Sequence, residues 1–479
     1  MCSRYMKRRE LIIGLVIIVI SVLSTIFIIL NPNKGDIYGC LFMLPASFAI
    51  LSFIFIDVYK YIGKYISISL ILGVYFFRSV IIPIVMSIGN YHTLVKKNSI
   101  NILSMNYAII IMMIELVVVF LTIYFVRKKF QALNFKSSTF VIKGNMSSYL
   151  LVFFLIIVIP IIVFYPQVLG YISFSLNLSF QKQYQHYINI LNMQQQVPKL
   201  IYNLFIYVFT YTKYLLPFWS IKLVYEKIPY TKNKFICSCF IIIFNLLFLS
   251  ENKASSFFET CALIWIIGDL YPAYKKKFFT CIVVAMPILI FAGIIFKSLG
   301  SGGRSLSIFE DLSLIFQAYF GGPANVAVGC DLGNVLEYSP SIIIWDILRN
   351  FFPISFLFKS KTTSTGIFNN ALYGNVGVED QIMPMIAQLH FYVGPFLCTI
   401  LIAGIIVLAI KCETKIIMKN YMLKCLYLYI SILLSVSLVT YNITILVYEI
   451  SVLLPLLLVS SFCAKYINYN GKTIKTMTT

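Results

Sequence analysis

The sequence predicts an all-α polytopic membrane protein, and three observations carry this prediction. Of the 479 residues, 60% are hydrophobic and only 11% are charged, whereas soluble domains are about 25% charged. The mean hydropathy is +0.90. Apolar runs recur along the whole length, and about 20 helical residues are enough to cross a hydrocarbon layer of about 30 Å. A water-soluble fold is therefore not expected.

Twelve apolar runs have the length and composition of membrane-spanning helices. The first run is too long for a secretory signal and lacks a small-residue cleavage site, so we expect it to be an uncleaved span. In chain order the twelve runs are residues 11–30, 38–57, 65–88, 104–126, 147–167, 201–221, 235–250, 254–271, 278–296, 389–410, 421–440 and 443–463.

The basic residues predict the orientation of these spans. The net charge is +21, and Lys and Arg cluster between the apolar runs. With the N-terminus inside, 24 of the 38 Lys and Arg fall in inside segments and 11 in outside segments, which is the bias of the positive-inside rule. We therefore expect both termini in the cytoplasm. No helix-turn-helix pattern or aromatic-interleaved basic stretch accompanies the charge, so nucleic acid is not an expected partner.

A long outside segment between spans nine and ten predicts three parts in the chain. Residues 1–296 hold spans one to nine, and residues 389–479 hold spans ten to twelve and a cytoplasmic tail. Residues 297–388 form an extracytoplasmic loop, and loops of this length in compact proteins are usually functional or disordered. The loop contains apolar and aromatic stretches, so we expect it to fold back onto the membrane surface as short interfacial helices.

One such helix can be read directly from the loop. Ser339 followed by Pro340 is a good helix start, because a serine caps the first turn and proline suits the first helical position. The apolar run continues to Phe352 and precedes Pro353, which should end the helix. With Asp346 and Arg349 interspersed in this run, the helix is predicted to be interfacial or re-entrant.

Three outside cations are candidates for binding a diphosphate: Lys253, Arg304 and Arg349. Each lies near a membrane boundary or near the predicted interfacial helix. Fixed cations at the headgroup plane can stabilise a diphosphate leaving group, and guanidinium presents paired donors for it. The alternative is that they are ordinary interfacial cations that neutralise lipid phosphate.

A histidine and two acids near the end of the loop are candidates for proton transfer. His390 is predicted to lie where the loop enters span ten, and a neutral imidazole there could accept a proton from a sugar hydroxyl. Glu379 and Asp380 could act as a base or orient one, although adjacent acids are more often solvated. His92 and His186 are expected to be solvated loop residues. These scattered histidines do not make a metal site, and no nucleotide-binding loop is present, so neither metal nor cofactor is expected.

Four charged residues fall inside predicted spans: Arg78, Glu115, Glu259 and Glu449. Charges at this depth are costly, so these residues are either functional or partners in buried ion pairs.

The layout resembles that of the Wzy-type oligosaccharide repeat-unit polymerases, the family of O-antigen and capsular polysaccharide polymerases. These proteins have about a dozen spans and a large external loop toward the C-terminus. Glu251-Asn252-Lys253-Ala254-Ser255 stands where the family carries a basic residue at the outer start of a span, two spans before the loop. Here lysine replaces the arginine of many relatives. The stretch from Asp380 to Pro395 is similar to the family's loop exit.

The resemblance implies a GT-C-like fold and a glycosyltransferase activity at the outer face of the bacterial cytoplasmic membrane. A glycan would pass from an undecaprenyl-diphosphate-linked donor to the terminal sugar of another lipid-linked repeat unit. Arg304, Lys253 or Arg349 would hold the diphosphate, and His390, Glu379 or Asp380 would assist proton removal. The implied partners are the lipid-linked oligosaccharide, membrane lipids, and a chain-length regulator and flippase of the same pathway.

The main alternative is a lipid-linked oligosaccharide flippase, which also has about twelve spans and a basic composition. A flippase should bury cations along a central cavity and keep its external loops short. Arg78 and Lys213 favour this alternative mildly, and the long loop opposes it. A membrane O-acyltransferase would need a histidine deep in the membrane, and the sequence predicts none there.

Overall fold

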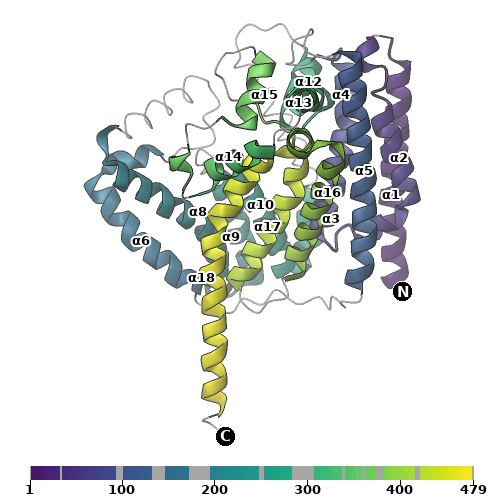
Figure 1. Ribbon diagram of the computed structural model, residues 1–479. Helices are drawn as coiled ribbons and strands as arrows, with labels where there is room; N and C mark the ends of the chain where they lie inside the picture. Colours follow the sequence, from purple (N-terminus) through teal and green to yellow (C-terminus); the bar gives the residue numbers. More distant parts are fainter. Residues whose placement is uncertain are drawn as a thin grey trace. The chain divides into compact units, whose positions relative to one another are not determined.

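The computed structural model describes helices only. All regular secondary structure in the residues that it describes is helical (Figure 1). These residues are 2–32, 35–92, 101–131, 146–171, 195–247, 253–282, 307–336, 340–352, 354–358, 362–373, 381–415 and 421–476.

Seven segments of the described chain are long and apolar enough to cross a membrane. They confirm the prediction of an α-helical polytopic membrane protein. The segments are Leu11–Leu30, Asp36–Ile54, Ile66–Ile88, Ile102–Val126, Met385–Thr414, Tyr421–Thr440 and Ile443–Phe462.

Four further predicted spans also fall on helices. Residues 147–167, 201–221, 235–250 and 254–271 overlap α6 (Met146–Phe164), α8 (Lys199–Lys227), α9 (Thr231–Leu247) and α10 (Lys253–Leu270). The predicted span 278–296 lies largely outside the described residues. A total of twelve crossings therefore stays a prediction.

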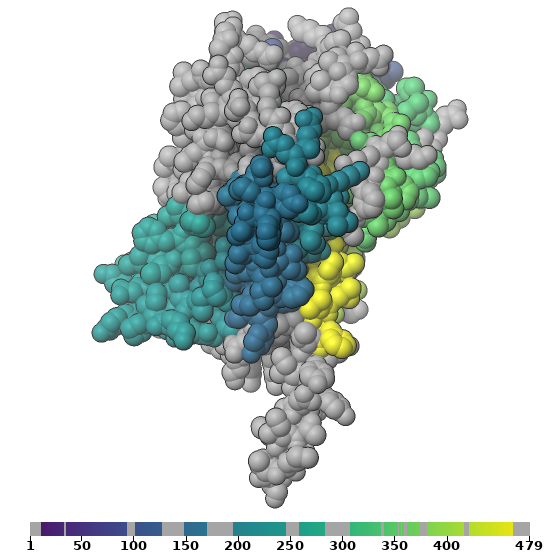
Figure 2. Space-filling model, turned by 90° about the vertical axis from the view of Figure 1, so that its left-hand side faces the viewer, coloured from purple at the N-terminus to yellow at the C-terminus, as the bar shows by residue number. Residues whose placement is uncertain are grey.

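The exposed face of α6 is that of a lipid-facing helix. Its strongly exposed side chains recur at intervals of three and four residues, which places them on one face. In water such a stripe would be unfavourable, whereas acyl chains of a bilayer would cover it. α6 lies in the foreground of the face drawn in Figure 2. The residues, each more than half exposed, are Tyr149, Val152, Phe153, Ile156, Ile159, Val163 and Phe164.

The contacts divide the chain into two units. Unit 1 comprises Met1–Phe135, Ser305–Thr414 and Ile430–Ser451, and unit 2 comprises Lys136–Arg304, Lys415–Tyr429 and Val452–Thr479. α17 (Tyr421–Thr440) and α18 (Ile443–Thr476) contribute residues to both units. The helices of the long loop belong to unit 1, together with the first four spans. The three-part division predicted from the sequence separates membrane spans from an extracytoplasmic loop and a cytoplasmic tail. This division stays a prediction.

Unit 1 is built from the N-terminal spans, the loop helices and α16. Its elements are α1 (Cys2–Leu30), η1 (Asp36–Tyr38), α2 (Met43–Ile54), η2 (Ile56–Tyr61), α3 (Ile66–Phe76), the π-helical turn η3 (Phe77–Ile81), α4 (Ile82–Ile88), α5 (Ile102–Gln131), α12 (Ile308–Tyr319), α13 (Pro323–Val335), α14 (Pro340–Asn350), η6 (Ile354–Leu357), α15 (Ser364–Tyr373) and α16 (Met385–Thr414).

The loop helix α12 packs at the end of unit 1 where the span Ile66–Ile88 finishes. Gly89 lies so close to the start of α12 that an added Cβ would come within 2.5 Å of the Phe309 carbonyl oxygen. At the other end of the same span, Glu413 near the end of α16 accepts the backbone N–H of Ile66 at 2.7 Å. In Figure 1 the N-terminus of α1 lies at the end of unit 1 opposite to α12, α13 and α15.

The loop helix α13 is buried between α5 and α16, which contact it along its length. Two glycines one turn apart allow the close approach to α16. A Cβ at Gly329 would lie 2.6 Å from the Ala387 Cβ, and a Cβ at Gly333 would lie 2.9 Å from Nδ1 of His390. Small residues at this spacing bring membrane helices into backbone contact.

α16 is interrupted at Gly394 and Pro395. Gly394 has φ 78° and ψ −179°, a conformation that glycine adopts without steric cost. Proline at the next position lacks the N–H that would continue the ladder. The segment Met385–Val393 is therefore a short half-helix inside unit 1, and it carries the polar residues described below.

Unit 2 holds α6, η5 (Pro166–Tyr171), α8, α9 and α10. α6 packs against α8 through a cluster that includes Val158, Phe205 and Val208. The Trp219 indole donates to Ser148 Oγ at 3.0 Å between the same two helices.

Candidate functional site

The structure describes the side chain of one of the three predicted diphosphate-binding cations. Arg349 lies on α14 and is partly buried. Lys253 is the first residue of α10 in unit 2, and its side chain lies outside the described residues. Arg304 also lies outside them, as do Glu379 and Asp380. The predicted roles of these four residues stay predictions.

The helix predicted in the loop is present as α14, and its position at the membrane interface stays a prediction. It begins at Pro340, as the sequence indicates, and ends at Asn350, two residues earlier than the apolar run. Asp346 faces the interior of unit 1 and is fully buried, while Ile344 on the same helix is 58% exposed. The helix is therefore amphipathic, with its one acid on the packed face.

His390 is fully buried near the start of α16, the helix that follows the loop, and its role in proton transfer stays a prediction. It lies five residues into α16, about 8 Å along the helix at 1.5 Å per residue. Its Nε2 lies 2.8 Å from the hydroxyl of Tyr107 on α5, and the two rings meet edge to face with centroids 5.5 Å apart. Tyr107 is itself only partly buried.

A polar cluster around Asp346 joins three helices of unit 1. The backbone N–H of Ser364 donates to both carboxylate oxygens at 3.2 Å. The Tyr392 hydroxyl donates to Oδ2, and Ser364 Oγ lies 3.2 Å from that hydroxyl. Ser364 is the first residue of α15, whose N-terminus favours a negative group. The carboxylate is thus held by α15 and α16 at once.

The same network continues to the start of α18. Gln388 Nε2 donates to Ser364 Oγ at 2.7 Å, and its Oε1 accepts the N–H of Ile443 at 2.7 Å. Nearby, Asn442 Nδ2 donates to Thr365 Oγ1 at 3.3 Å. We call Asp346, Ser364, Gln388 and Tyr392 the α14–α16 clamp, because their bonds tie the loop helices to a span and to the turn before α18.

The electrostatics of Asp346 are set by burial. Removal from water raises the pKa of this carboxyl above its ordinary value, because burial disfavours the charged form. Hydrogen bonds from Ser364 and Tyr392, and the charge of Arg349 one turn along α14, act in the opposite direction and lower the pKa. Burial is the larger effect. Arg349 is thus the cation whose field reaches the clamp.

Two of the charged residues in the membrane spans form an ion pair. Arg78 in η3 pairs with Glu115 on α5, and both side chains are buried. The Tyr75 hydroxyl donates to Glu115 Oε1 at 2.6 Å, and the Arg78 guanidinium lies 5.4 Å from the Tyr75 ring centre. The sequence left open whether these charges were functional or paired, and the structure shows the pair. Glu259 and Glu449 are also fully buried.

His92, expected to be solvated, is partly buried four residues after the end of α4. Its backbone carbonyl accepts from Ser313 Oγ at 2.8 Å and from Gln317 Nε2 at 3.1 Å, both on α12. His92 therefore helps to dock the loop through its backbone. His186 lies outside the described residues.

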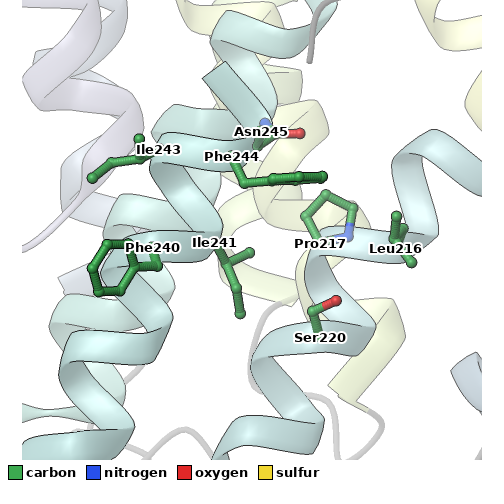
Figure 3. Close-up of a pocket in the computed structure, with 8 residues that line it drawn as sticks. All are labelled: Leu216, Pro217, Ser220, Phe240, Ile241, Ile243, Phe244 and Asn245. Atoms are coloured by element: carbon green, nitrogen blue, oxygen red, sulfur yellow. The ribbon is translucent and has the colours of Figure 1, made fainter. Parts of the chain in front are cut away.

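A groove of about 450 Å³ lies between α8 and α9 in unit 2 (Figure 3). None of the residues that line it is charged, so it offers no site for a diphosphate. The lining residues are Leu216, Pro217, Ser220, Phe240, Ile241, Ile243, Phe244 and Asn245.

Within the described part of the chain, no three His, Cys, Asp or Glu residues come together as metal ligands. No protein-family model, curated protein or solved structure matches the chain.

Proposed function

We propose that the protein polymerises undecaprenyl-diphosphate-linked oligosaccharide repeat units at the outer face of the bacterial cytoplasmic membrane. In this proposal the chain crosses the membrane twelve times in a GT-C-like arrangement, with both termini in the cytoplasm. Its partners are the lipid-linked substrate, the surrounding lipids, and the flippase and chain-length regulator of the same pathway.

One observation carries the proposal. The long loop contains helices that are packed into unit 1, and one of them presents the partly buried Arg349 beside a hydrogen-bonded clamp. A guanidinium at this position can hold a diphosphate through paired charge-assisted hydrogen bonds.

The proposed reaction balances without any group beyond substrate and side chains. The hydroxyl of the acceptor sugar attacks the anomeric carbon of the donor, and the bond from that carbon to the diphosphate oxygen breaks. The lipid diphosphate leaves with the bonding electrons, and the cation proposed to stabilise it is Arg349, with Arg304 or Lys253 as the alternatives. The acceptor proton passes to the Tyr107 oxygen as the Tyr107 proton passes to Nε2 of His390, 2.8 Å away. Glu379 and Asp380 remain the alternative proton acceptors.

The flippase alternative requires buried cations along a cavity. Arg78 is buried, but it is neutralised by Glu115 rather than presented to a cavity. An O-acyltransferase requires a histidine deep in the membrane, and His390 lies only about 8 Å from the start of its helix.

A complementation experiment tests the proposal. A strain lacking the protein receives the wild-type chain, Arg349→Ala, Arg349→Lys, or the control Asp311→Asn, which removes an acid from loop helix α12. We expect a polysaccharide ladder with wild type and Asp311→Asn, a ladder shortened to single units with Arg349→Ala, and partial recovery with Arg349→Lys. Membrane abundance is measured in parallel by immunoblot.

The location of the lipid-linked species that accumulates distinguishes a polymerase from a flippase. If the protein is a polymerase, the deletion strain accumulates single repeat units that an outer-face glycosidase can reach. Units that stay protected inside the cell would instead identify a flippase and overturn the proposal. Full-length polymer with Arg349→Ala at normal abundance would remove Arg349 from the site.

A further inference from the structure

Asp346 and Arg349 lie one turn apart on α14 but in different environments. The Asp346 carboxylate is fully buried, whereas Arg349 is partly exposed. Residues three apart on a helix are neighbours on its surface. A displacement of the Asp346 side of α14 therefore moves Arg349 as well.

Asp346 is bonded on the side that faces the protein. Its oxygens accept the Ser364 N–H and the Tyr392 hydroxyl. The Ser364 N–H is itself fixed, because α15 begins there and Thr363 Oγ1 accepts the Gly366 N–H at 3.1 Å in the same turn. A buried carboxylate with these donors has no oxygen turned to solvent, so it cannot touch a substrate.

The donors are anchored in turn. Tyr392 and Gln388 lie one turn apart on the half-helix of α16 that ends at Gly394. Gln388 bridges Ser364 Oγ and the Ile443 N–H. Two residues after α14 ends, the Phe352 N–H donates to Ser451 Oγ at 2.9 Å on α18. The position of α14 is thus determined by hydrogen bonds to α15, α16 and α18.

We infer that Asp346 is a positioning residue of the reaction, which acts through Arg349 by fixing α14 in the clamp. This inference rests on the proposed function, because it assigns Asp346 to the binding of the donor diphosphate by Arg349. Asp346 takes no part in bond making or breaking. Its effect is to hold the guanidinium where the diphosphate binds, and a misplacement of about 1 Å can reduce a rate by up to about a hundredfold.

The charged and titratable groups that face Asp346 are Arg349 on its own helix and Tyr392 on α16. Asp346→Asn keeps an oxygen to accept the Ser364 N–H and removes the charge. Asp346→Ala removes both the acceptor and the charge. Comparison of the two variants separates the geometric role of the hydrogen bonds from the field on Arg349.

The first experiment measures the clamp without reference to activity. The full chain is purified in detergent, and amide hydrogen exchange is followed in peptides from α14 and α15. We expect faster exchange in both helices for Asp346→Ala, little change for Asp346→Asn, and no change for the control Asp311→Asn. Unchanged exchange in Asp346→Ala would overturn the inference, whatever the function of the protein.

The second experiment is a double-mutant cycle on donor elongation. KM for the lipid-diphosphate-linked donor and kcat are measured for Asp346→Ala, Arg349→Ala and the double variant. We expect Asp346→Ala to raise the donor KM by about tenfold or more, and the double variant to match Arg349→Ala. Asp346→Asn should raise the donor KM less than Asp346→Ala does.

The outcomes are distinguishable. If Asp346→Ala raised the donor KM by the same factor in the Arg349→Ala background as in the wild type, Asp346 would act independently of Arg349, as a merely structural residue would. That result would overturn the inference. Wild-type protein that does not elongate the donor, yet shows the expected exchange pattern, would overturn the proposed function and with it the positioning role of Asp346 in the reaction.

Discussion

Arg78 and Glu115 form an ion pair inside unit 1, with both side chains at most 1% exposed. The pair joins the π-helical turn η3 to α5, and the Tyr75 hydroxyl donates to the same carboxylate. The π-helical turn inserts an extra residue into the ladder and rotates the side chains that follow it. The pair therefore links the third span to the fourth through buried side chains.

Replacement of one partner should destabilise the protein more than replacement of both. Arg78→Ala leaves Glu115 buried without its cation, which we expect to lower the free energy of unfolding by about 3 to 5 kcal/mol. Arg78→Met with Glu115→Met removes both charges and should cost less. The measurement is thermal unfolding of the detergent-solubilised protein.

The exposed pair Lys60–Asp57 is the control, since both side chains are about half exposed. Lys60→Ala should change the free energy of unfolding by at most about 1 kcal/mol. If Arg78→Ala were no less stable than the double variant, Glu115 would not depend on Arg78 to compensate its buried charge.

The packing of α13 against α16 predicts that alanine substitutions at two different glycines change the stability by different amounts. Gly329→Ala places a Cβ 2.6 Å from the Ala387 Cβ, so the helices must separate, at a cost of about 1 to 3 kcal/mol. Gly404→Ala on α16 meets no atom within 4 Å and should be neutral or stabilising by up to about 1 kcal/mol. Unfolding temperatures of the two variants check this. Equal shifts would contradict the close packing of α13.

The buried Asp346 predicts a dependence of stability on pH. Because the pKa of Asp346 is raised in the fold, the folded protein binds this proton more tightly than the unfolded chain does. The ionised carboxylate therefore destabilises the fold, and its cost appears as pH rises from the ordinary aspartate pKa, about 3.9, to the raised one. Asp346→Asn does not ionise and should gain stability relative to wild type across this window.

Chemical denaturation at a series of pH values measures this difference. The variant-minus-wild-type free energy should rise through the window and then stay constant above it. A difference that falls with increasing pH would mean that hydrogen bonds and Arg349 outweigh burial at this carboxyl.

The position of the loop relative to the membrane can be tested on α14. Ile344 is 58% exposed, so Ile344→Cys should react with a membrane-impermeant maleimide in intact cells. Lys60→Cys, in the segment predicted to be inside, should react only after permeabilisation. The parent chain gives the background from native cysteines. Labelling of position 344 only after permeabilisation would place α14 in the cytoplasm.

The sequence predicted the features that depend on local pattern. The apolar run from Leu11 to Leu30 forms a helix long and apolar enough to cross a membrane, because a helix makes its backbone hydrogen bonds within itself and these side chains are apolar. α14 begins at Pro340, because proline at the first helical position needs no intrahelical N–H partner.

The sequence could not predict contacts between distant residues. Tyr107 and His390 are 283 residues apart, and no local pattern links them. The importance of Tyr392 and Gln388 was missed for the same reason, and Asp346 was interpreted only as a polar residue in an interfacial helix. Arg78 and Glu115 were recognised as costly charges, but their pairing depends on the packing of two spans.

Reconstitution of the purified chain tests the central claim most directly. The protein is placed in proteoliposomes with an undecaprenyl-diphosphate-linked repeat unit on the accessible face, and the products are sized by mass spectrometry. We expect lipid-linked glycans of two and more repeat units, with release of one lipid diphosphate for each bond formed, and no elongation with Arg349→Ala. Substrate that stays one repeat unit long, or that only crosses the bilayer, would contradict the account.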